Sequence, residues 1–113
     1  MREPTYFVLA ALLAGPLHGY AIMKRAEELS GGRVRLPTGT LYTALDRLTA
    51  EGQVRLVGEE TVAGRMRRTY GLTESGSAAL RAEAQRMAEA ARLVIDSEAD
   101  AKAGRLARKL RAT

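Results

Sequence analysis

Short polar side chains cluster within the stretch LPTGTLYTALDRLTAEGQV, residues 36–54. Leu41, Leu45 and Leu48 recur at helical spacing and predict a buried helix face. The opposite side of the first turns offers hydroxyls that can bond to base edges, and a glycine that lets the backbone approach phosphate. A helix that enters the major groove of DNA needs such a surface. The candidate contacts are Thr38, Gly39, Thr40, Tyr42, Thr43 and Arg47.

These residues also have ordinary structural roles. Thr38 and Thr40 can cap the helix, Gly39 can loosen its first turn, and Tyr42 can pack sideways against a neighbouring element. Such roles explain any one of them alone, whereas their grouping on one face favours DNA contact.

Three guanidinium groups lie close together farther along the chain. Arg65, Arg67 and Arg68 belong to the polar segment GEETVAGRMRR, which we predict to be a mobile loop between two strands. Guanidinium groups at a hairpin tip suit phosphate or minor-groove contact, although edge strands also carry cations that resist aggregation. Tyr70 alternates with Leu72 and is expected in the core.

The elements that must position these residues are predicted in the order helix, helix, helix, hairpin, long helix. The first helix is expected over residues 5–14, the second between His18-Gly19 and Ser30-Gly31-Gly32, and the third between Pro37-Thr38 and Gly52. The hydrophobic period then changes from 3.6 to 2, which predicts strands around residues 54–57 and 69–72. Residues 33–36 also alternate and could add a short third strand. This order is that of a winged helix-turn-helix, a mainly α fold with a small β-hairpin.

A long helix is predicted to follow Thr73, its expected cap. A heptad pattern on it predicts pairing with a second copy of the chain. After residue 94 the apolar positions shift, which either a bent continuous helix or a break near Asp96-Ser97 would explain. We therefore expect residues 1–73 to form the winged helix-turn-helix and residues 74–113 a helical dimerisation segment packed on the same domain. The expected seam consists of Leu80, Ala84, Met87, Ala91 and Val94.

Composition excludes several classes of protein. The chain has 113 residues, 46% of them hydrophobic and 27% charged, as in a globular domain. It has no cysteine, and His18 alone cannot build a metal site, so neither a metal nor another cofactor is expected. The net charge of +5 favours a polyanionic partner. No apolar run approaches the ~18 residues that a membrane span needs, and no signal-peptide pattern is present, which predicts a cytoplasmic protein. Motifs of phosphate-binding loops, hydrolases and dinucleotide-binding enzymes are missing, and catalysis is not expected.

Three blocks of the sequence resemble the signature blocks of the PadR family of transcription regulators, in the same order and spacing. They read PLHGYAIMKRAEEL, LPTGTLYTALDRLTAEGQV and GRMRRTYGLTESGSAAL, and the resemblance covers roughly residues 5 to 81. Similarity to the short subgroup implies a dimer paired through the fourth helix and repression of promoters through an inverted repeat. It also implies that a planar, often aromatic, molecule near the dimer interface releases DNA in some members. The segment after Leu93 matches no family pattern, and the long helix lacks tryptophan.

The resemblance assigns further residues. The DNA-facing tyrosine of the family's recognition helix falls on Tyr42, and the tyrosine of its HGY block falls on Tyr20. Tyr20 could meet phosphate or act as a buried anchor, and Lys24 could add a phosphate contact or be solvated. Tyr6 and Phe7 are the aromatic side chains available to an effector. The runner-up interpretation is a winged helix that binds another protein or binds nucleic acid without specificity.

Overall fold

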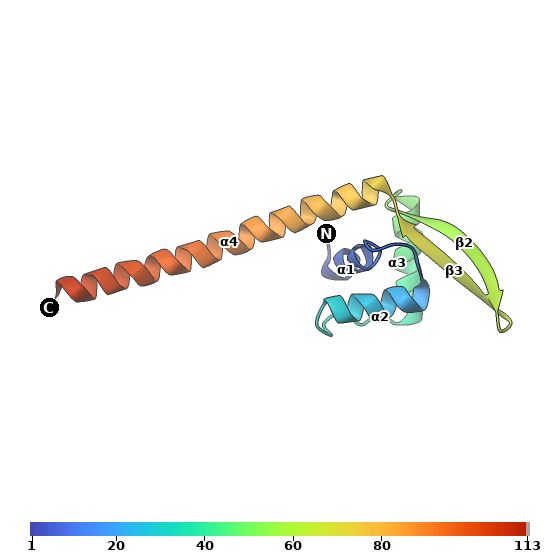
Figure 1. The fold of residues 1–113 in the computed structure, drawn as a ribbon, viewed down its shortest axis with the longest axis horizontal. Helices are drawn as coiled ribbons and strands as arrows, with labels where there is room; N and C mark the ends of the chain where they lie inside the picture. The colour runs from blue at the N-terminus through green and yellow to red at the C-terminus, as the bar shows by residue number, and fades with distance from the viewer. Residues whose placement is uncertain (113) are drawn as a thin grey trace. The chain divides into compact units, whose positions relative to one another are not determined.

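The computed structural model describes residues 1–112, and Figure 1 shows its elements. The chain falls into two compact units, one from Met1 to Arg81 and one from Ala82 onward. The elements are α1 Glu3–Ala11, β1 Leu17–His18, α2 Gly19–Leu29, α3 Thr38–Ala50, β2 Val54–Val62, β3 Arg65–Leu72 and α4 Glu74–Arg111. The predicted fold class is confirmed: a winged helix-turn-helix with a long C-terminal helix.

The core of the first unit lies where the first three helices meet the base of the sheet. Leu41, Leu45 and Leu48 of α3 are at most 1% exposed, as the helical spacing predicts. Tyr70, only 3% exposed, joins the core from β3. Each such side chain stabilises the fold by about 1.5 to 3 kcal/mol. The inner face of α3 is therefore committed to packing, and its outer face is exposed.

The helix ends differ from prediction at α1 only. This helix begins at Glu3, because Pro4 fits the first turn where no amide bond is lost, and it ends at Ala11 rather than residue 14. Leu12 and Leu13 donate instead to Leu9 and Ala10 in tighter turns. The end of α3 is as predicted, with Gly52 at a φ of 76°.

The prediction of a mobile loop between the two strands is wrong. The strands continue through it to a two-residue turn at Ala63 and Gly64, whose φ angles of 51° and 77° match a type I′ hairpin. Val57 is an extra residue in β2, since Leu56 pairs with Tyr70 and Gly58 with Thr69. This hairpin, residues 54–72, is the wing. Both of its faces are exposed beyond its base, so no alternation of apolar residues marks its strands.

The third strand of the sheet is not residues 33–36 but β1, giving the antiparallel order β1-β3-β2. In residues 33–36 the Val34 side chain is buried, and its amide donates to the Ser30 hydroxyl at 2.9 Å. Arg33 and Arg35 form ion pairs with Glu3 and Glu27. Charged and apolar residues alternate in this segment because the two arginines form ion pairs on either side of one buried valine, and the segment itself is a loop.

The start of α4 is fixed as predicted. The Thr73 hydroxyl accepts from the Gly76 amide at 2.9 Å and donates to the Gly52 carbonyl at 2.6 Å. A Cβ atom on Gly76 would lie 2.9 Å from the carbonyl carbon of Gln53, so this turn requires glycine. The helix continues without a break through Asp96-Ser97, which decides between the two alternatives. No helix within residues 1–112 combines the length and apolar character needed to cross a membrane.

Candidate nucleic-acid interface

The N-terminal end of α3 and the turn of the wing lie on the same side of the first unit (Figure 1). Thr38, Gly39, Thr40 and Thr43 are all exposed there. Thr43 donates its hydroxyl hydrogen to the Gly39 carbonyl at 2.9 Å, which leaves its oxygen as an acceptor and its methyl group outside. This end of α3 thus presents the small polar surface that the sequence predicts.

Tyr42 is half-buried and packs against the first residue of α2. A Cβ atom on Gly19 would lie 2.8 Å from the Cζ atom of Tyr42, closer than side chains normally approach. Gly19 itself is buried. The glycine of the HGY block therefore makes room for the phenol ring and sets where the Tyr42 hydroxyl lies.

A groove of about 340 Å³ separates the start of α2 from the wing. We call it the wing groove. Arg65 and Arg67 line it from β3, and Tyr42 lines it from α3. Its full lining is His18, Gly19, Tyr20, Tyr42, Val62, Arg65, Met66 and Arg67.

Tyr20 stands at the rim of the wing groove and is 61% exposed, so it is not a buried anchor. The Lys24 ammonium lies 5.7 Å from the centre of its ring, within range of a cation–π contact. Together these two side chains place a phenol and a positive charge on the exposed side of α2.

Arg68 lies in β3 rather than at a loop tip, and it is engaged within the wing. Its Nε atom is 3.1 Å from the Glu59 carboxylate, across the strand pair. Its hydrogen bond to the Tyr70 hydroxyl, together with the Glu59 charge, raises the pKa of Arg68. Burial raises the pKa of Tyr70, and the Arg68 hydrogen bond opposes that shift. Arg68 therefore connects the wing to the core, while Arg65 and Arg67 remain at the groove.

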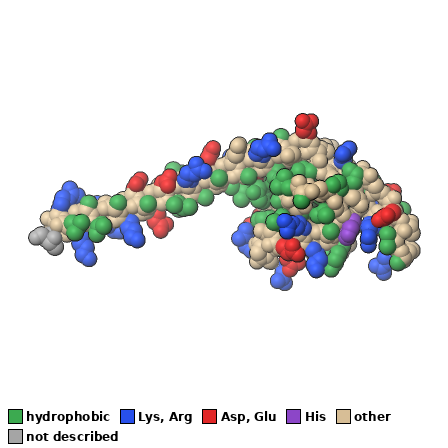
Figure 2. Space-filling model, viewed as in Figure 1, with side chains coloured by type: hydrophobic (Ala, Val, Ile, Leu, Met, Phe, Trp, Pro, Cys, Tyr) green, Lys and Arg blue, Asp and Glu red, His purple; other side chains and the backbone are tan. Residues whose placement is uncertain are grey.

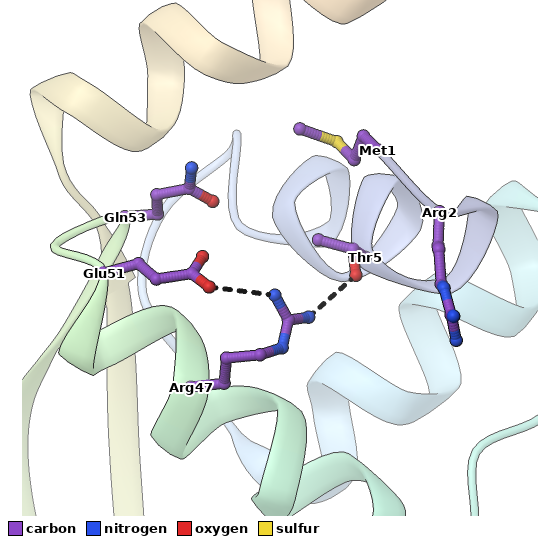
Figure 3. A pocket seen from close by; sticks show the side chains of 6 residues that line it. All are labelled: Met1, Arg2, Thr5, Arg47, Glu51 and Gln53. Carbon is purple, nitrogen blue, oxygen red and sulfur yellow. Dashed lines mark hydrogen bonds and ion pairs between the residues drawn. The ribbon is translucent and has the colours of Figure 1, made fainter.

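Arg47 is turned toward α1, as Figure 3 shows. Its guanidinium donates to the Thr5 hydroxyl at 3.0 Å and to the Glu51 carboxylate at 3.3 Å. The bond to Thr5 ties α3 to α1 beside a pocket of about 540 Å³, and the bond to Glu51 stays within the C-terminal end of α3. The structure therefore does not bring Arg47 together with Tyr42 and the wing.

Basic side chains gather along the lower edge of the first unit in Figure 2, the side toward which α3 and the wing turn point. Among residues 1–112, no group of three or more His, Asp or Glu side chains could hold a metal ion. The chemistry that this surface offers is hydrogen bonding and attraction of anions.

Some residues of this surface were not among the sequence candidates. His18 caps α2 by accepting from the Ala21 amide at 3.4 Å, and it lines the wing groove. Val62 and Met66 reach the groove because the hairpin is longer than predicted. The HGY spacing just before a helix was the available signal for His18, whereas the sequence carried none for the two apolar residues.

Comparison with known proteins was consistent with these features. A family model described as the transcriptional regulator PadR-like family matches residues 8–82. A transcriptional regulator of Mycobacterium tuberculosis is 42% identical over 73 residues, which cover 64% of this chain and 66% of that protein. An uncharacterised 37.1 kDa protein in a transposon of Streptomyces fradiae is 46% identical over 96 residues, or 85% of this chain, but these are only 26% of that protein.

Among solved structures, Bacillus subtilis PadR in complex with operator DNA matches with a TM-score of 0.62 and 29% identity. The match covers 71% of this chain and 46% of that one. The chain thus spans about a quarter of the transposon protein, about two thirds of the mycobacterial regulator and less than half of this solved relative.

Proposed function

Since this chain belongs to the PadR-like family of transcriptional regulators, we propose that it is a homodimeric repressor that binds an inverted-repeat operator. In this proposal α3 enters the major groove, the wing contacts the flanking backbone, and α4 pairs two copies of the chain. The observation that carries the proposal is the exposed polar end of α3 beside a groove lined by Arg65 and Arg67. The Bacillus subtilis relative, solved with operator DNA, supports the same role for this surface.

The alternatives differ from this proposal in what they would do with DNA. A protein-binding winged helix would not need cations around an exposed polar helix end, and it would bind no DNA even at low salt. A non-specific binder would keep its affinity when the target sequence is scrambled. The family and the mycobacterial relative are described as transcriptional regulators, which gives no support to a catalytic function.

The contrast between α3 and the wing tests the proposal. The DNA used in this binding assay is a duplex that the unmodified protein selects from a pool of random sequences. Thr40→Ala is expected to change the preference among variants of that duplex by about 1 to 3 kcal/mol at one base pair. Arg67→Ala is expected to weaken binding to all variants alike, and to flatten the slope of log affinity against log salt by about 0.9.

Two matched variants serve as controls. Thr49 lies at the other end of α3, with its hydroxyl bonded to the Leu45 carbonyl at 2.7 Å, so Thr49→Ala should not change sequence preference. Arg55 lines a groove with Leu13, Pro16 and Glu74, away from α3. Arg55→Ala removes the same charge as Arg67→Ala and should leave the salt slope unchanged. Equal effects of Thr40→Ala and Thr49→Ala would contradict the proposal.

We also propose that a planar aromatic effector releases the DNA. Tyr6 and Phe7 supply the aromatic surface: their rings meet edge to face, with centroids 5.2 Å apart, and both side chains are half-buried. A panel of phenolic acids and planar drugs should include one compound that lowers the affinity for the selected duplex, and Phe7→Leu should weaken that response. Unchanged affinity across the whole panel would favour a constitutive repressor.

A further inference from the structure

A second groove runs along the other flank of α3, between this helix and the N-terminal end of α1. We call it the α1 groove. Its volume is about 730 Å³, larger than that of the wing groove. Arg2 lines it from the start of α1, and Thr40 and Thr43 line it from α3.

The spacing along α3 separates the two grooves. Thr40, Thr43, Ala44 and Arg47 follow the i, i+3, i+4, i+7 pattern of one helix flank, and all four line the α1 groove. Tyr42 lies off that flank and lines the wing groove. When a helix lies in the major groove of DNA, a sugar–phosphate strand runs along each of its sides. The two grooves therefore lie where the two strands of a bound duplex would pass.

Ion pairing distinguishes three of the arginines that line these grooves, Arg2, Arg65 and Arg67, from Arg47 and from most other arginines of the first unit. Five arginines each lie within 4.0 Å of a carboxylate oxygen, namely Arg25, Arg33, Arg35, Arg47 and Arg68. Arg2, Arg65 and Arg67 form no such pair within residues 1–112. In Figure 3 the drawn bonds join Arg47 to Thr5 and Glu51, and none reaches Arg2.

The acid nearest to Arg2 in sequence is also neutralised. Glu3 accepts two contacts of 2.7 Å from the Arg33 guanidinium, through Nε and Nη2. Its charge is thus balanced, which reduces its repulsion of an incoming phosphate. Arg47, held by Thr5 and Glu51, fixes the opposite wall of the groove. The result is a groove with one unpaired guanidinium and threonine hydroxyls, which suits a phosphodiester.

We propose that Arg2 binds a backbone phosphate in the α1 groove, on the DNA strand opposite to the one that Arg65 and Arg67 contact in the wing groove. This inference rests on the proposed function and adds a second strand contact to it. It makes α1 part of the DNA-binding surface, so that α3 is held from both sides. A phosphate contact carries no base information, so Arg2 would contribute affinity and orientation to the complex rather than sequence preference.

Arg2→Ala tests the inference by salt dependence. The Arg2 side chain makes no capping hydrogen bond to α1, so the variant should fold normally. With the selected duplex, we expect the slope of log affinity against log salt to flatten by about 0.9, as for Arg67→Ala. The affinity lost between 50 and 200 mM salt would then be roughly threefold smaller than for the unmodified protein. Arg55→Ala is the control with the same change in net charge.

Single methylphosphonate substitutions in the selected duplex identify the strand. Each one removes the charge of one phosphate, so a variant that lacks the matching guanidinium should be indifferent to it. We expect Arg2→Ala to become indifferent to a phosphate on one strand, and Arg67→Ala to a phosphate on the other.

Two different failures can be distinguished. If Arg2→Ala keeps the salt slope of Arg55→Ala while Arg67→Ala flattens it, the inference about α1 is overturned and the proposed function stands. The inference is likewise overturned if both variants become indifferent to phosphates of the same strand. If the unmodified protein enriches no duplex from the random pool, the proposed function itself fails.

Discussion

Replacing Tyr42 with alanine is expected to abolish specific binding of the selected duplex, whereas replacing it with phenylalanine should retain part of the affinity. The ring lies between the exposed end of α3 and the wing groove, and Gly19 fixes its position. In that position the hydroxyl can reach a phosphate while the ring packs against sugar or a thymine methyl group. Alanine removes both contacts, and phenylalanine removes only the first. Fluorescence anisotropy with the selected and a scrambled duplex measures both effects.

Gly19→Ala tests the same contact from the opposite side. An added Cβ atom would meet the Tyr42 ring, so the ring must shift although its chemistry is unchanged. We expect this variant to lose sequence preference in the same direction as Tyr42→Ala, and to a smaller extent. Since both changes also affect packing, thermal unfolding must show that the variants are folded at the assay temperature. The interpretation of α3 is wrong if folded Tyr42→Ala keeps both the affinity and the salt slope of the unmodified protein.

The helical part of the fold could be predicted because its signals are local. Leucines at positions 41, 45 and 48 mark a helix with one buried face, and Gly52 marks its end. The wing could not be predicted in the same way. Its outer half is exposed on both faces, so the apolar alternation that indicates a strand is missing there. Its turn carries alanine before glycine, not the asparagine or aspartate that usually precedes glycine in a type I′ hairpin.

The sequence predicted the chemical type of the candidate-site residues better than it predicted which side chains they contact. Thr40 and Thr43 line the α1 groove on one flank of α3, and Tyr42 lines the wing groove on the other. Arg47 and Arg68 have the right chemistry for DNA, yet each is bonded to a carboxylate brought close by the fold. Glu51 is one helical turn from Arg47, a pairing that spacing alone could suggest, whereas Glu59 meets Arg68 only through the register of the hairpin. No local sequence pattern points to Arg2 as a site residue, since its place beside α3 depends on tertiary packing.

The other large expected effect concerns the pairing of two chains, and it involves the second unit. From Ala82 onward α4 exposes a series of large apolar side chains that nothing within the described unit covers. Met87 is 46% exposed and Val94 63%, and both belong to the predicted heptad seam. Leu80, predicted as the first residue of that seam, is instead buried in the core of the first unit at 4% exposure. A further stripe follows at Ile95 and Leu106, which are 64% and 57% exposed. An apolar stripe of this length on a helix is generally paired, and a second copy of the chain offers the same stripe.

Met87→Glu should therefore dissociate the proposed dimer or unfold the helix. The change forfeits the burial of two methionine side chains, about 3 to 6 kcal/mol in a symmetric pair, and adds two like charges in the seam. Since 1.4 kcal/mol corresponds to a tenfold change in the dissociation constant, the expected loss exceeds a hundredfold. Light scattering at micromolar concentration should give the mass of two chains for the unmodified protein and of one chain for a folded variant. Gln85→Glu adds the same charge two residues away, off the seam, and should leave the dimer intact. A mass of one chain for the unmodified protein would remove α4 as a pairing element, and an inverted repeat would then have no two-fold partner on the protein.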